Sequence, residues 1–303
     1  MTQRRHVLIL AHTGRDVTVD AAAKALALLR DGGVVPVLTP TERDDLAGRC
    51  DVDGVEVLGE GVRVDDLELV VVLGGDGTIL RASELVRDTD VPLLGVNMGH
   101  VGFLAEAEAD DLTRVIQRVV ERRWDVEERR AIAVTVRQDD RIVHRDWALN
   151  EASVEKAARE RMVEVVLEVD GRPLSTFGCD GVVVSTPTGS TAYAFSAGGP
   201  VIWPTLDAML VVPLSAHALF ARPLVVPPSS TVAVEVLRRT PTSGVLWCDG
   251  RRMFDLEVGA RVEIGASPRP VRLARIHSEG DRFTDRLVHK FDLPVSGWRG
   301  PGS

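Results

Sequence analysis

An aspartate surrounded by glycines is the residue of this chain best placed for chemistry. The motif Gly74-Gly75-Asp76-Gly77 follows an apolar run that predicts a buried strand and precedes a segment that predicts a helix. Glycines allow close approach of the backbone to a ligand, and a helix N-terminus attracts phosphate. A carboxylate there would repel phosphate, so it suits a general base for an attacking hydroxyl or a holder of a metal ion that bridges phosphates. A tight turn closed by an Asx hydrogen bond is the alternative.

Two further motifs offer groups that could hold a ligand. The stretch 178–200 combines glycines with small hydroxyl residues and contains Tyr193, the only tyrosine, on which a base or ribose could pack. The pair Asn150-Glu151 offers the donors and acceptors that suit a ribose diol. A Ser/Thr-rich loop between strands and an ordinary solvated pair are the alternatives.

Several familiar motifs are absent from the chain. No GxxxxGK[ST] loop is present, which excludes P-loop NTPases, and no strict GxGxxG is found. The absence of HExxH and GxSxG disfavours metalloproteases and α/β-hydrolases.

Composition sets further limits on the class of protein. The 303 residues are 45% hydrophobic and 27% charged, which excludes wholesale disorder. The net charge of −9 argues against general nucleic-acid binding, which needs a positive field. Cys50, Cys179 and Cys248 form no CxxC motif, so we expect neither a disulfide framework nor a structural zinc site, and a cytoplasmic setting. The apolar stretch 7–11 is too short for a signal peptide, and the prolines and glycines of the uncharged stretch 181–206 exclude a membrane span.

The first part of the chain alternates apolar runs with helical patterns. This alternation predicts an open, mainly parallel sheet with crossover helices. The expected strands are 6–12, 34–39, 68–73 and 92–97, and the expected helices are 19–29, 78–86 and 110–123.

After Trp124 the pattern changes to short β-branched segments, the last of them at 270–276. The turn dipeptides Asp170-Gly171 and Asp249-Gly250 are of the hairpin type, so this part is expected to be mainly antiparallel. A closing helix is expected at 282–291. The predicted fold class is therefore two-domain α+β. We expect an α/β nucleotide-binding domain at 1–124, joined by the C-terminal segment 281–303, and a β-rich dinucleotide-binding domain at 125–280.

Taken together and in this order, the three motifs resemble the NAD kinase family, in particular bacterial ATP/polyphosphate-type NAD kinases. The resemblance extends from the strand before Gly74 to the segment 283–287. The loop GGDGT alone would also suit diacylglycerol, sphingosine or phosphofructokinase-like enzymes. Asn150-Glu151, followed by Thr186-Pro-Thr-Gly-Ser-Thr-Ala-Tyr193, points to NAD kinases within that superfamily.

The resemblance implies an activity and its partners. The terminal phosphoryl group of ATP would pass to the 2′-hydroxyl of the adenosine ribose of NAD⁺, giving NADP⁺, with polyphosphate as a second candidate donor. A divalent cation, Mg²⁺, is implied, with no protein ligand assigned to it. Such enzymes are usually homo-oligomers, so a dimer or tetramer is expected, with no nucleic acid and no membrane as partner.

The resemblance also implies roles for individual residues. Asp76 matches the proton acceptor, Gly77 lies against the same ligand, and Arg81 matches a phosphate-facing arginine. The pair Asn150 and Glu151 matches the ribose- and adenine-side contacts, Arg161 the basic residue after that pair, and Asp180 a ligand-contacting acid. The dinucleotide-wrapping segment corresponds to Thr191, Ala192, Tyr193, Ala194, Phe195 and Ser196.

Two other functions remain open from the sequence. One is a module that senses NAD(H) without chemistry, although the intact Asp76 among its glycines favours a kinase. The other is a lipid or sphingoid kinase of the same superfamily, which would have an apolar acceptor tunnel.

Overall fold

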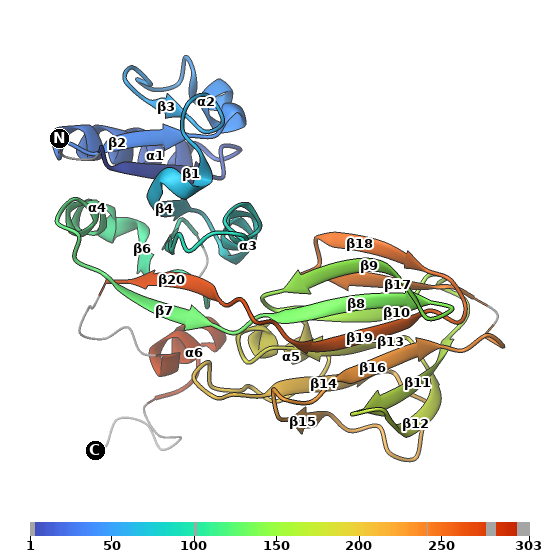
Figure 1. Ribbon diagram of the computed structural model, residues 1–303. Helices are drawn as coiled ribbons and strands as arrows, with labels where there is room; N and C mark the ends of the chain where they lie inside the picture. The colour runs from blue at the N-terminus through green and yellow to red at the C-terminus, as the bar shows by residue number, and fades with distance from the viewer. Residues whose placement is uncertain (1–3, 100–101, 241, 277–282, 296–303) are drawn as a thin grey trace, which may run out of the picture. The chain divides into compact units, whose positions relative to one another are not determined.

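The structure is a computed structural model that describes residues 4–99, 102–240, 242–276 and 283–295. The chain divides into two compact units (Figure 1). The first comprises Met1–Glu128 with Arg272–Ser303, and the second comprises Arg129–Val271.

An eight-stranded sheet forms the centre of the first unit. Its order is β3-β2-β1-β4-β5-β20-β7, with β6 paired to β5, and the pairs from β3 through to β20 are parallel. Apart from Glu68, strand β4 is apolar and buried, so both of its faces can be covered, as is usual in parallel sheets. The strands are β1 (His6–Ala11), β2 (Val35–Leu38), β3 (Glu56–Val57), β4 (Leu67–Leu73), β5 (Leu93–Asn97), β6 (Ala107–Glu108), β7 (Asp125–Arg129) and β20 (Val271–Arg275).

Helices complete this unit, and α1 and α4 bury apolar faces against the sheet. Leu26 of α1 and Ile116 of α4 share one buried cluster with Leu69 and Val71 of β4. In the described part of the chain, no helix is long and apolar enough to cross a membrane. The helices are α1 (Asp16–Asp31), α2 (Pro40–Leu46), α3 (Asp76–Leu85), α4 (Leu112–Val120) and α6 (Phe283–Phe291), with 3₁₀ turns η1 (Val64–Asp66) and η2 (Ala109–Asp111).

Several elements of this unit differ from the sequence prediction, and β7, which was expected in the β-rich part, instead joins this sheet. The segment 270–276 was expected in the antiparallel part, but its strand β20 pairs parallel to β5 through Leu273 and Leu93. Leu273 and Ala274 are both buried, so the two faces of β20 are covered, and a short apolar run does not reveal which sheet it joins. Helix α2 was not expected, although Thr39 caps it by accepting the N–H of Glu42, and Pro40 stands at its first position.

The second unit consists of two six-stranded sheets whose recorded pairs are all antiparallel. Their orders are β15-β14-β13-β10-β17-β18 and β12-β11-β16-β19-β8-β9. Val154 and Val182 of the first sheet share one buried cluster with Val165 and Val234 of the second, so the two sheets pack face to face. The strands are β8 (Ile132–Gln138), β9 (Arg141–Ala148), β10 (Glu151–Lys156), β11 (Val163–Val169), β12 (Arg172–Cys179), β13 (Gly181–Ser185), β14 (Met209–Leu214), β15 (Leu224–Val226), β16 (Val232–Val236), β17 (Gly244–Cys248), β18 (Arg252–Leu256) and β19 (Arg261–Ala266).

Both expected hairpin turns are present in this unit. Asp170 and Gly171 join β11 to β12 with φ of 53° and 72°, and Asp249 and Gly250 join β17 to β18 with φ of 54° and 60°. Positive φ at both central residues is the type I′ geometry that the sequence of each turn indicates. The 3₁₀ turn η3 (Thr188–Thr191) and the short helix α5 (Tyr193–Ser196) follow β13. The predicted two-domain α+β fold class is confirmed.

Candidate active site

The glycine motif forms the junction between β4 and α3. Helix α3 begins at Asp76, with Gly75 as its N-cap and no side-chain cap. A Cβ on Gly74 would lie 2.4 Å from the Thr78 hydroxyl, whereas Gly75 and Gly77 are exposed and face open space. Because the first N–H groups of a helix lack intrahelical partners, this end of α3 presents open backbone donors to an anion.

Asp76 is held by a loop distant in sequence. Its Oδ2 accepts the N–H of Phe103 at 3.0 Å, and its Oδ1 accepts the N–H of Leu104 at 3.1 Å. A Cβ on Gly102 would lie 2.3 Å from Asp76 Oδ1, so a larger residue here would force the carboxylate to shift. The carboxylate is therefore fixed beside the helix start by the backbone of the loop that follows β5.

The C-terminal helix supports this loop. Arg286 of α6 donates to the carbonyl oxygen of Phe103 at 2.9 Å. The Phe103 ring lies 5.9 Å from that of Phe283 and 6.0 Å from that of Phe291, measured between centroids. Helix α6 thus stabilises the loop that positions Asp76.

Arg81 lies further along α3 and is anchored at the carboxyl end of β1. Its Nη2 donates to the Ala11 carbonyl oxygen at 3.1 Å and to Glu42 Oε1 at 2.6 Å. Glu42 is buried, and its Oε2 has no hydrogen-bond partner among the described residues. Burial raises the pKa of Glu42 although Arg81 acts to lower it. Sequence reasoning missed Glu42 because it missed α2.

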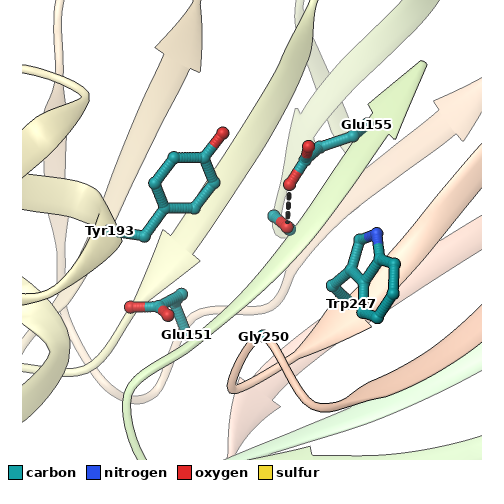
Figure 2. A pocket seen from close by; sticks show the side chains of 6 residues that line it. Glu151, Glu155, Tyr193, Trp247 and Gly250 are labelled. Carbon is teal, nitrogen blue, oxygen red and sulfur yellow. Dashed lines mark hydrogen bonds between the residues drawn. The ribbon is translucent and has the colours of Figure 1, made fainter.

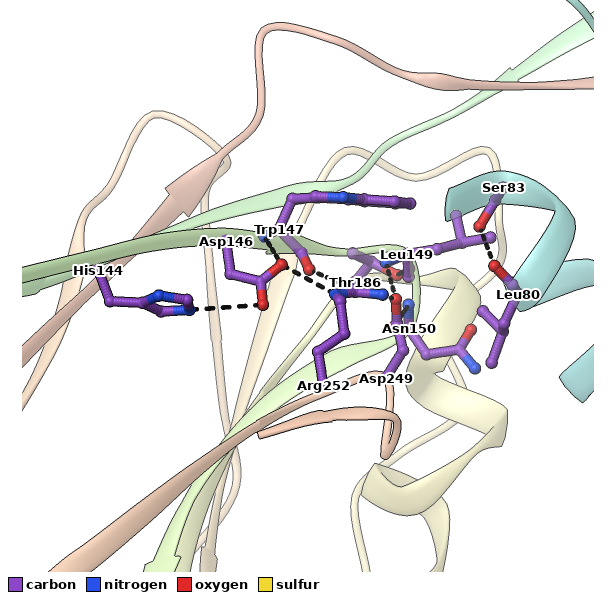
Figure 3. A network of polar contacts seen from close by, with 10 residues as sticks. All are labelled: Leu80, Ser83, His144, Asp146, Trp147, Leu149, Asn150, Thr186, Asp249 and Arg252. Atoms are coloured by element: carbon purple, nitrogen blue, oxygen red, sulfur yellow. Dashed lines mark hydrogen bonds and ion pairs between the residues drawn. The ribbon is translucent and has the colours of Figure 1, made fainter. Parts of the chain in front are cut away.

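In the second unit, Asn150 lies buried in the bend between β9 and β10 (Figure 3), and the buried Glu151 is the first residue of β10. The Asp249 carboxylate accepts the N–H groups of Leu149 at 3.0 Å and Asn150 at 2.6 Å. The N–H of Asp249 donates to the Glu151 carbonyl oxygen at 2.9 Å. The hairpin turn after β17 therefore clamps the backbone of the Asn150-Glu151 pair.

A chain of charges continues from Asp249 toward the surface. Arg252 Nη2 lies 3.4 Å from Asp249 Oδ2, and Arg252 Nε donates to Asp146 Oδ1 at 2.9 Å. Arg252 also donates to the Trp147 carbonyl oxygen, and its guanidinium lies 5.0 Å from the Trp147 ring centroid. His144 Nε2 lies 3.6 Å from Asp146 Oδ2 at the far end of this network (Figure 3).

Glu151 is a buried acid with an unusual proton affinity. Burial, and after it the neighbouring Asp249 carboxyl, raises the pKa of Glu151 to about 8. Burial also raises the pKa of Asp249. Glu151 Oε2 is buried and has no hydrogen-bond partner among the described residues. A buried acid with a raised pKa and one oxygen without a hydrogen-bond partner among the described residues marks a candidate functional site.

The hydroxyl-rich stretch packs directly on the bend that precedes Glu151. The N–H of Thr186 donates to the Asn150 carbonyl oxygen at 2.9 Å, and the Thr186 hydroxyl donates to the Leu149 carbonyl oxygen at 2.6 Å. A Cβ on Gly189 would lie 2.1 Å from the Asn150 oxygen. Two motifs that are separate in the sequence thus meet in one place.

Residues of the segment 191–196 differ in their exposure. Tyr193, Phe195 and Ser196 are exposed, and Thr191 and Ala192 are half-buried. Ala194 is fully buried in a cluster with Val183 and Leu210, so its side chain packs in the core and a ligand could reach only its backbone.

Asp180 and Arg161 belong to the same unit. Asp180 is half-buried and pairs with Lys156 at 2.6 Å, and this hydrogen bond lowers the pKa of Asp180. Arg161 is exposed in the segment before β11.

A pocket of about 270 Å³ opens beside Glu151 (Figure 2). Tyr193 and Trp247 line it together with Glu151, Ser153 and Glu155 of β10, and Gly250. The alternation of three polar residues along β10 was visible in the sequence, but the opposing Trp247 was not, because it comes from β17.

The described residues contain no group of three or more His, Cys, Asp or Glu side chains that could hold a metal ion. Both oxygens of Asp76 accept backbone hydrogen bonds. The side chains of the described residues therefore do not provide a set of ligands for a permanently bound metal ion.

The fold and site together define a class. A carboxylate fixed at a glycine-rich helix start can accept the proton of a hydroxyl group that attacks a phosphate. This arrangement is that of a phosphotransferase acting on nucleotides.

Comparisons with known proteins narrow this class. The model of the ATP-NAD kinase N-terminal domain matches residues 7–124, and that of the ATP-NAD kinase C-terminal domain matches residues 149–276. The chain belongs to the ATP-NAD kinase family. It is 59% identical over 302 residues to an NAD kinase of Leifsonia xyli subsp. xyli, and 58% identical over 306 residues to NAD kinase 2 of Streptomyces coelicolor. Each match covers 99% of both chains.

Solved structures agree with this assignment. An NAD kinase from Archaeoglobus fulgidus in complex with ATP superposes with a TM-score of 0.69 at 26% identity, covering 96% of this chain and 100% of that one. Yeast NADH kinase complexed with NADH gives a TM-score of 0.85 at 24% identity, covering 98% and 90%, and shares the fold. The predicted family, fold class and function as an NAD kinase, a phosphotransferase, are confirmed.

Proposed function

We propose that this kinase transfers the terminal phosphoryl group of ATP to the 2′-hydroxyl of the adenosine ribose of NAD⁺, with Asp76 as the proton acceptor. The hydroxyl oxygen forms a bond to phosphorus, the bond from that phosphorus to the bridging oxygen of ADP breaks, and the hydroxyl proton passes to the Asp76 carboxylate. The observation that carries this proposal is the fixed position of Asp76 beside the open backbone of Gly75 and Gly77.

The first unit supplies groups for the phosphates of ATP. The N–H groups at the start of α3, including that of Gly77, donate to phosphate oxygens, and Arg81 adds a positive charge that Glu42 holds in place. A divalent cation enters with ATP as part of the substrate complex, because the described residues do not fit a resident ion. No step is assigned to that ion.

The second unit supplies groups for NAD⁺. Asn150 and Glu151 provide the polar contacts, and Tyr193 provides a ring face. Asp180 and Arg161 are proposed to contact the same substrate, with the remaining contacts from the dinucleotide-wrapping segment: Thr191, Ala192, Ala194, Phe195 and Ser196.

Location and assembly are further parts of the proposal. The thiols of Cys50, Cys179 and Cys248 are free, which agrees with a reducing, cytoplasmic setting. The expected homo-oligomer, dimer or tetramer, stays a prediction.

A matrix of donors and acceptors on the purified full chain tests the activity. With Mg²⁺, we expect NADP⁺ from NAD⁺ and ATP, and the same matrix includes polyphosphate as donor and NADH and a sphingoid base as acceptors. Binding of NAD⁺ with no turnover by any donor would favour a sensing module. Phosphorylation of the lipid but not of NAD⁺ would favour a lipid kinase.

A further inference from the structure

A buried network of charges holds the loop after β5. Glu106, at the end of this loop, is buried, and its N–H donates to the Gly95 carbonyl oxygen of β5 at 2.7 Å. Its Oε2 lies 3.0 Å from Arg275 Nη1 and 3.6 Å from Arg286 Nη2. Its Oε1 accepts the N–H of Ile276 at 2.7 Å. Glu106 therefore joins β5, the end of β20 and α6 in one place.

The charges of this network lie largely out of water. The side chains of Glu106, Arg275 and Arg286 are 5%, 13% and 11% exposed. Arg275 also donates to Glu127 Oε2 at 2.6 Å and to the Leu104 carbonyl oxygen at 3.4 Å. Because a buried ion that loses its partner is strongly destabilising, each member of the network depends on the others.

Arg286 contacts the same peptide group that binds Asp76. Its Nη1 donates to the Phe103 carbonyl oxygen at 2.9 Å. The N–H of that peptide group belongs to Leu104 and donates to Asp76 Oδ1 at 3.1 Å. A single planar amide therefore connects the Arg286 guanidinium to the Asp76 carboxylate.

The amide between Phe103 and Leu104 transmits the charge of Arg286. A cation at the carbonyl oxygen polarises the amide, so its N–H becomes a stronger donor, and hydrogen bonds in such a chain reinforce one another. The guanidinium also fixes the plane of the amide and, with it, the direction of the N–H that holds Asp76. Arg286 therefore affects both the position of the Asp76 carboxylate and the strength with which it is held.

Apolar packing of α6 does not account for these charges. The Phe103 ring already contacts the rings of Phe283 and Phe291, which keeps the helix against the loop without any ion. Buried ion pairs carry a desolvation cost, and apolar side chains of similar volume are often at least as stabilising. The orientation that the guanidinium imposes on the loop backbone is therefore the better explanation of the network.

We propose that Arg286 and Glu106 are positioning residues for phosphoryl transfer. Arg286 orients the amide that holds Asp76 where it accepts the proton of the attacking hydroxyl, and Glu106 supplies the charge that holds Arg286. The inference rests on the proposed function, because Asp76 is the proton acceptor there. Both residues act through the loop, so they affect kcat and leave substrate binding unchanged.

The kinetic test measures kcat and KM of the full-length enzyme with NAD⁺ and ATP. In Arg286→Met the amide loses its charged partner, and kcat should fall by about ten- to a hundredfold, since a displacement of about 1 Å at a reacting group costs on the order of 10²-fold. KM for both substrates should stay within about twofold, because the lost interaction acts on the transition state. Glu106→Gln should give a smaller loss of kcat in the same direction.

Two further measurements distinguish positioning from folding. Arg286→Lys keeps the charge but not the planar fork, so its kcat should lie between that of the wild type and that of Arg286→Met. Guanidinium ion at millimolar concentration should raise kcat of Arg286→Ala and leave the wild type unchanged. Absence of any gain with guanidinium, together with a kcat of Arg286→Lys no higher than that of Arg286→Met, would overturn the proposal.

Arg5→Met is the matched control. Arg5 likewise donates to backbone carbonyl oxygens, those of Val119 and Val120, and it pairs with Glu68 at 2.8 Å in the same unit. This variant should lower Tm, as Arg286→Met does, and leave kcat unchanged. Wild-type kcat in Arg286→Met would overturn the proposal, as would an equal loss of kcat in Arg5→Met.

Two comparisons keep the outcome clear. If Arg286→Met does not fold, Arg286→Lys is compared with Arg5→Lys, and wild-type kcat in Arg286→Lys would overturn the proposal. Asp76→Asn separates this inference from the proposed function. Normal turnover by Asp76→Asn would contradict the proton acceptor itself, whereas an inactive Asp76→Asn beside a fully active Arg286→Met would sink only the positioning role.

Discussion

Glu42 Oε1 lies 2.6 Å from Arg81 Nη2, and Glu42 is almost fully buried while the Arg81 side chain is 43% exposed. The pair therefore joins a fixed carboxylate to an arginine that still reaches solvent. Since a buried carboxylate without a positive partner is costly, the Arg81 guanidinium stabilises the ionised form of Glu42. This relationship makes Glu42 a positioning residue for the arginine proposed to meet the phosphates of ATP.

Glu42→Gln tests this positioning role. The variant removes the charge that holds the guanidinium, so KM for ATP should rise by about tenfold while kcat changes less. Steady-state kinetics with varied ATP measure both quantities. Asp51→Asn is the control, because Asp51 forms an exposed pair with Arg30 in the same unit and should leave KM for ATP unchanged. An unaltered KM in Glu42→Gln would contradict the assigned role.

Gly102→Ala tests how closely the loop after β5 fixes Asp76. A Cβ at Gly102 would lie 2.3 Å from Asp76 Oδ1, so the carboxylate has to shift. A displacement of about 1 Å at a reacting group costs on the order of 10²-fold in rate, and kcat should fall by that amount. The control Gly265→Ala has room for a methyl group and should retain activity. Full activity in Gly102→Ala would show that the Asp76 position tolerates movement.

Glu151 predicts a pH dependence of stability. Its pKa is about 8 in the folded chain, against 4.5 for an ordinary glutamate, so the folded state holds an extra proton between these pH values. Stability associated with this group is therefore present below about pH 4.5 and is lost as pH rises toward 8. Glu151→Gln should raise Tm by several degrees at pH 8 and change it little at pH 4.5. Differential scanning calorimetry at both pH values decides the matter, and an equal Tm at pH 8 would count against the raised pKa.

Asp249→Asn tests the clamp on the Asn150-Glu151 pair. Asparagine offers one acceptor oxygen in place of two, so one of the N–H groups of Leu149 and Asn150 loses its partner. KM for NAD⁺ should rise, and the free energy of unfolding should fall by about 1–3 kcal/mol.

Asp170→Asn is the matched control for that clamp. Asp170 occupies the same position of the other type I′ turn, and its carboxylate bonds Ser230 and Thr231. This variant should leave KM for NAD⁺ unchanged. A similar change of KM in both variants would mean that Asp249 acts through general stability alone.

Local patterns in the sequence predicted much of the fold. The apolar run of β4, the start of α3 near Asp76 and the two hairpin turns are each encoded within a few neighbouring residues. Such signals depend on backbone conformation and hydrophobic periodicity, which act locally.

Features that depend on distant partners were not predictable in this way. The sheet that β20 joins is decided by packing against β5, and the bonds to Asp76 come from residues 27 and 28 positions later. Glu42 and Trp247 became site residues only when the fold brought them beside Arg81 and Glu151. The amino-acid sequence shows the residue types, whereas the roles of these residues depend on tertiary contacts.

The central claim is that Asp76 accepts the proton of the attacking hydroxyl. The most direct measurement is kcat for NADP⁺ formation by Asp76→Asn, beside the Kd for NAD⁺ from calorimetry, with the exposed Asp20→Asn on α1 as control. We predict a loss of about 10²- to 10⁴-fold in kcat with Kd nearly unchanged, and normal turnover in the control. Turnover by Asp76→Asn within a few fold of the wild type would contradict the assignment.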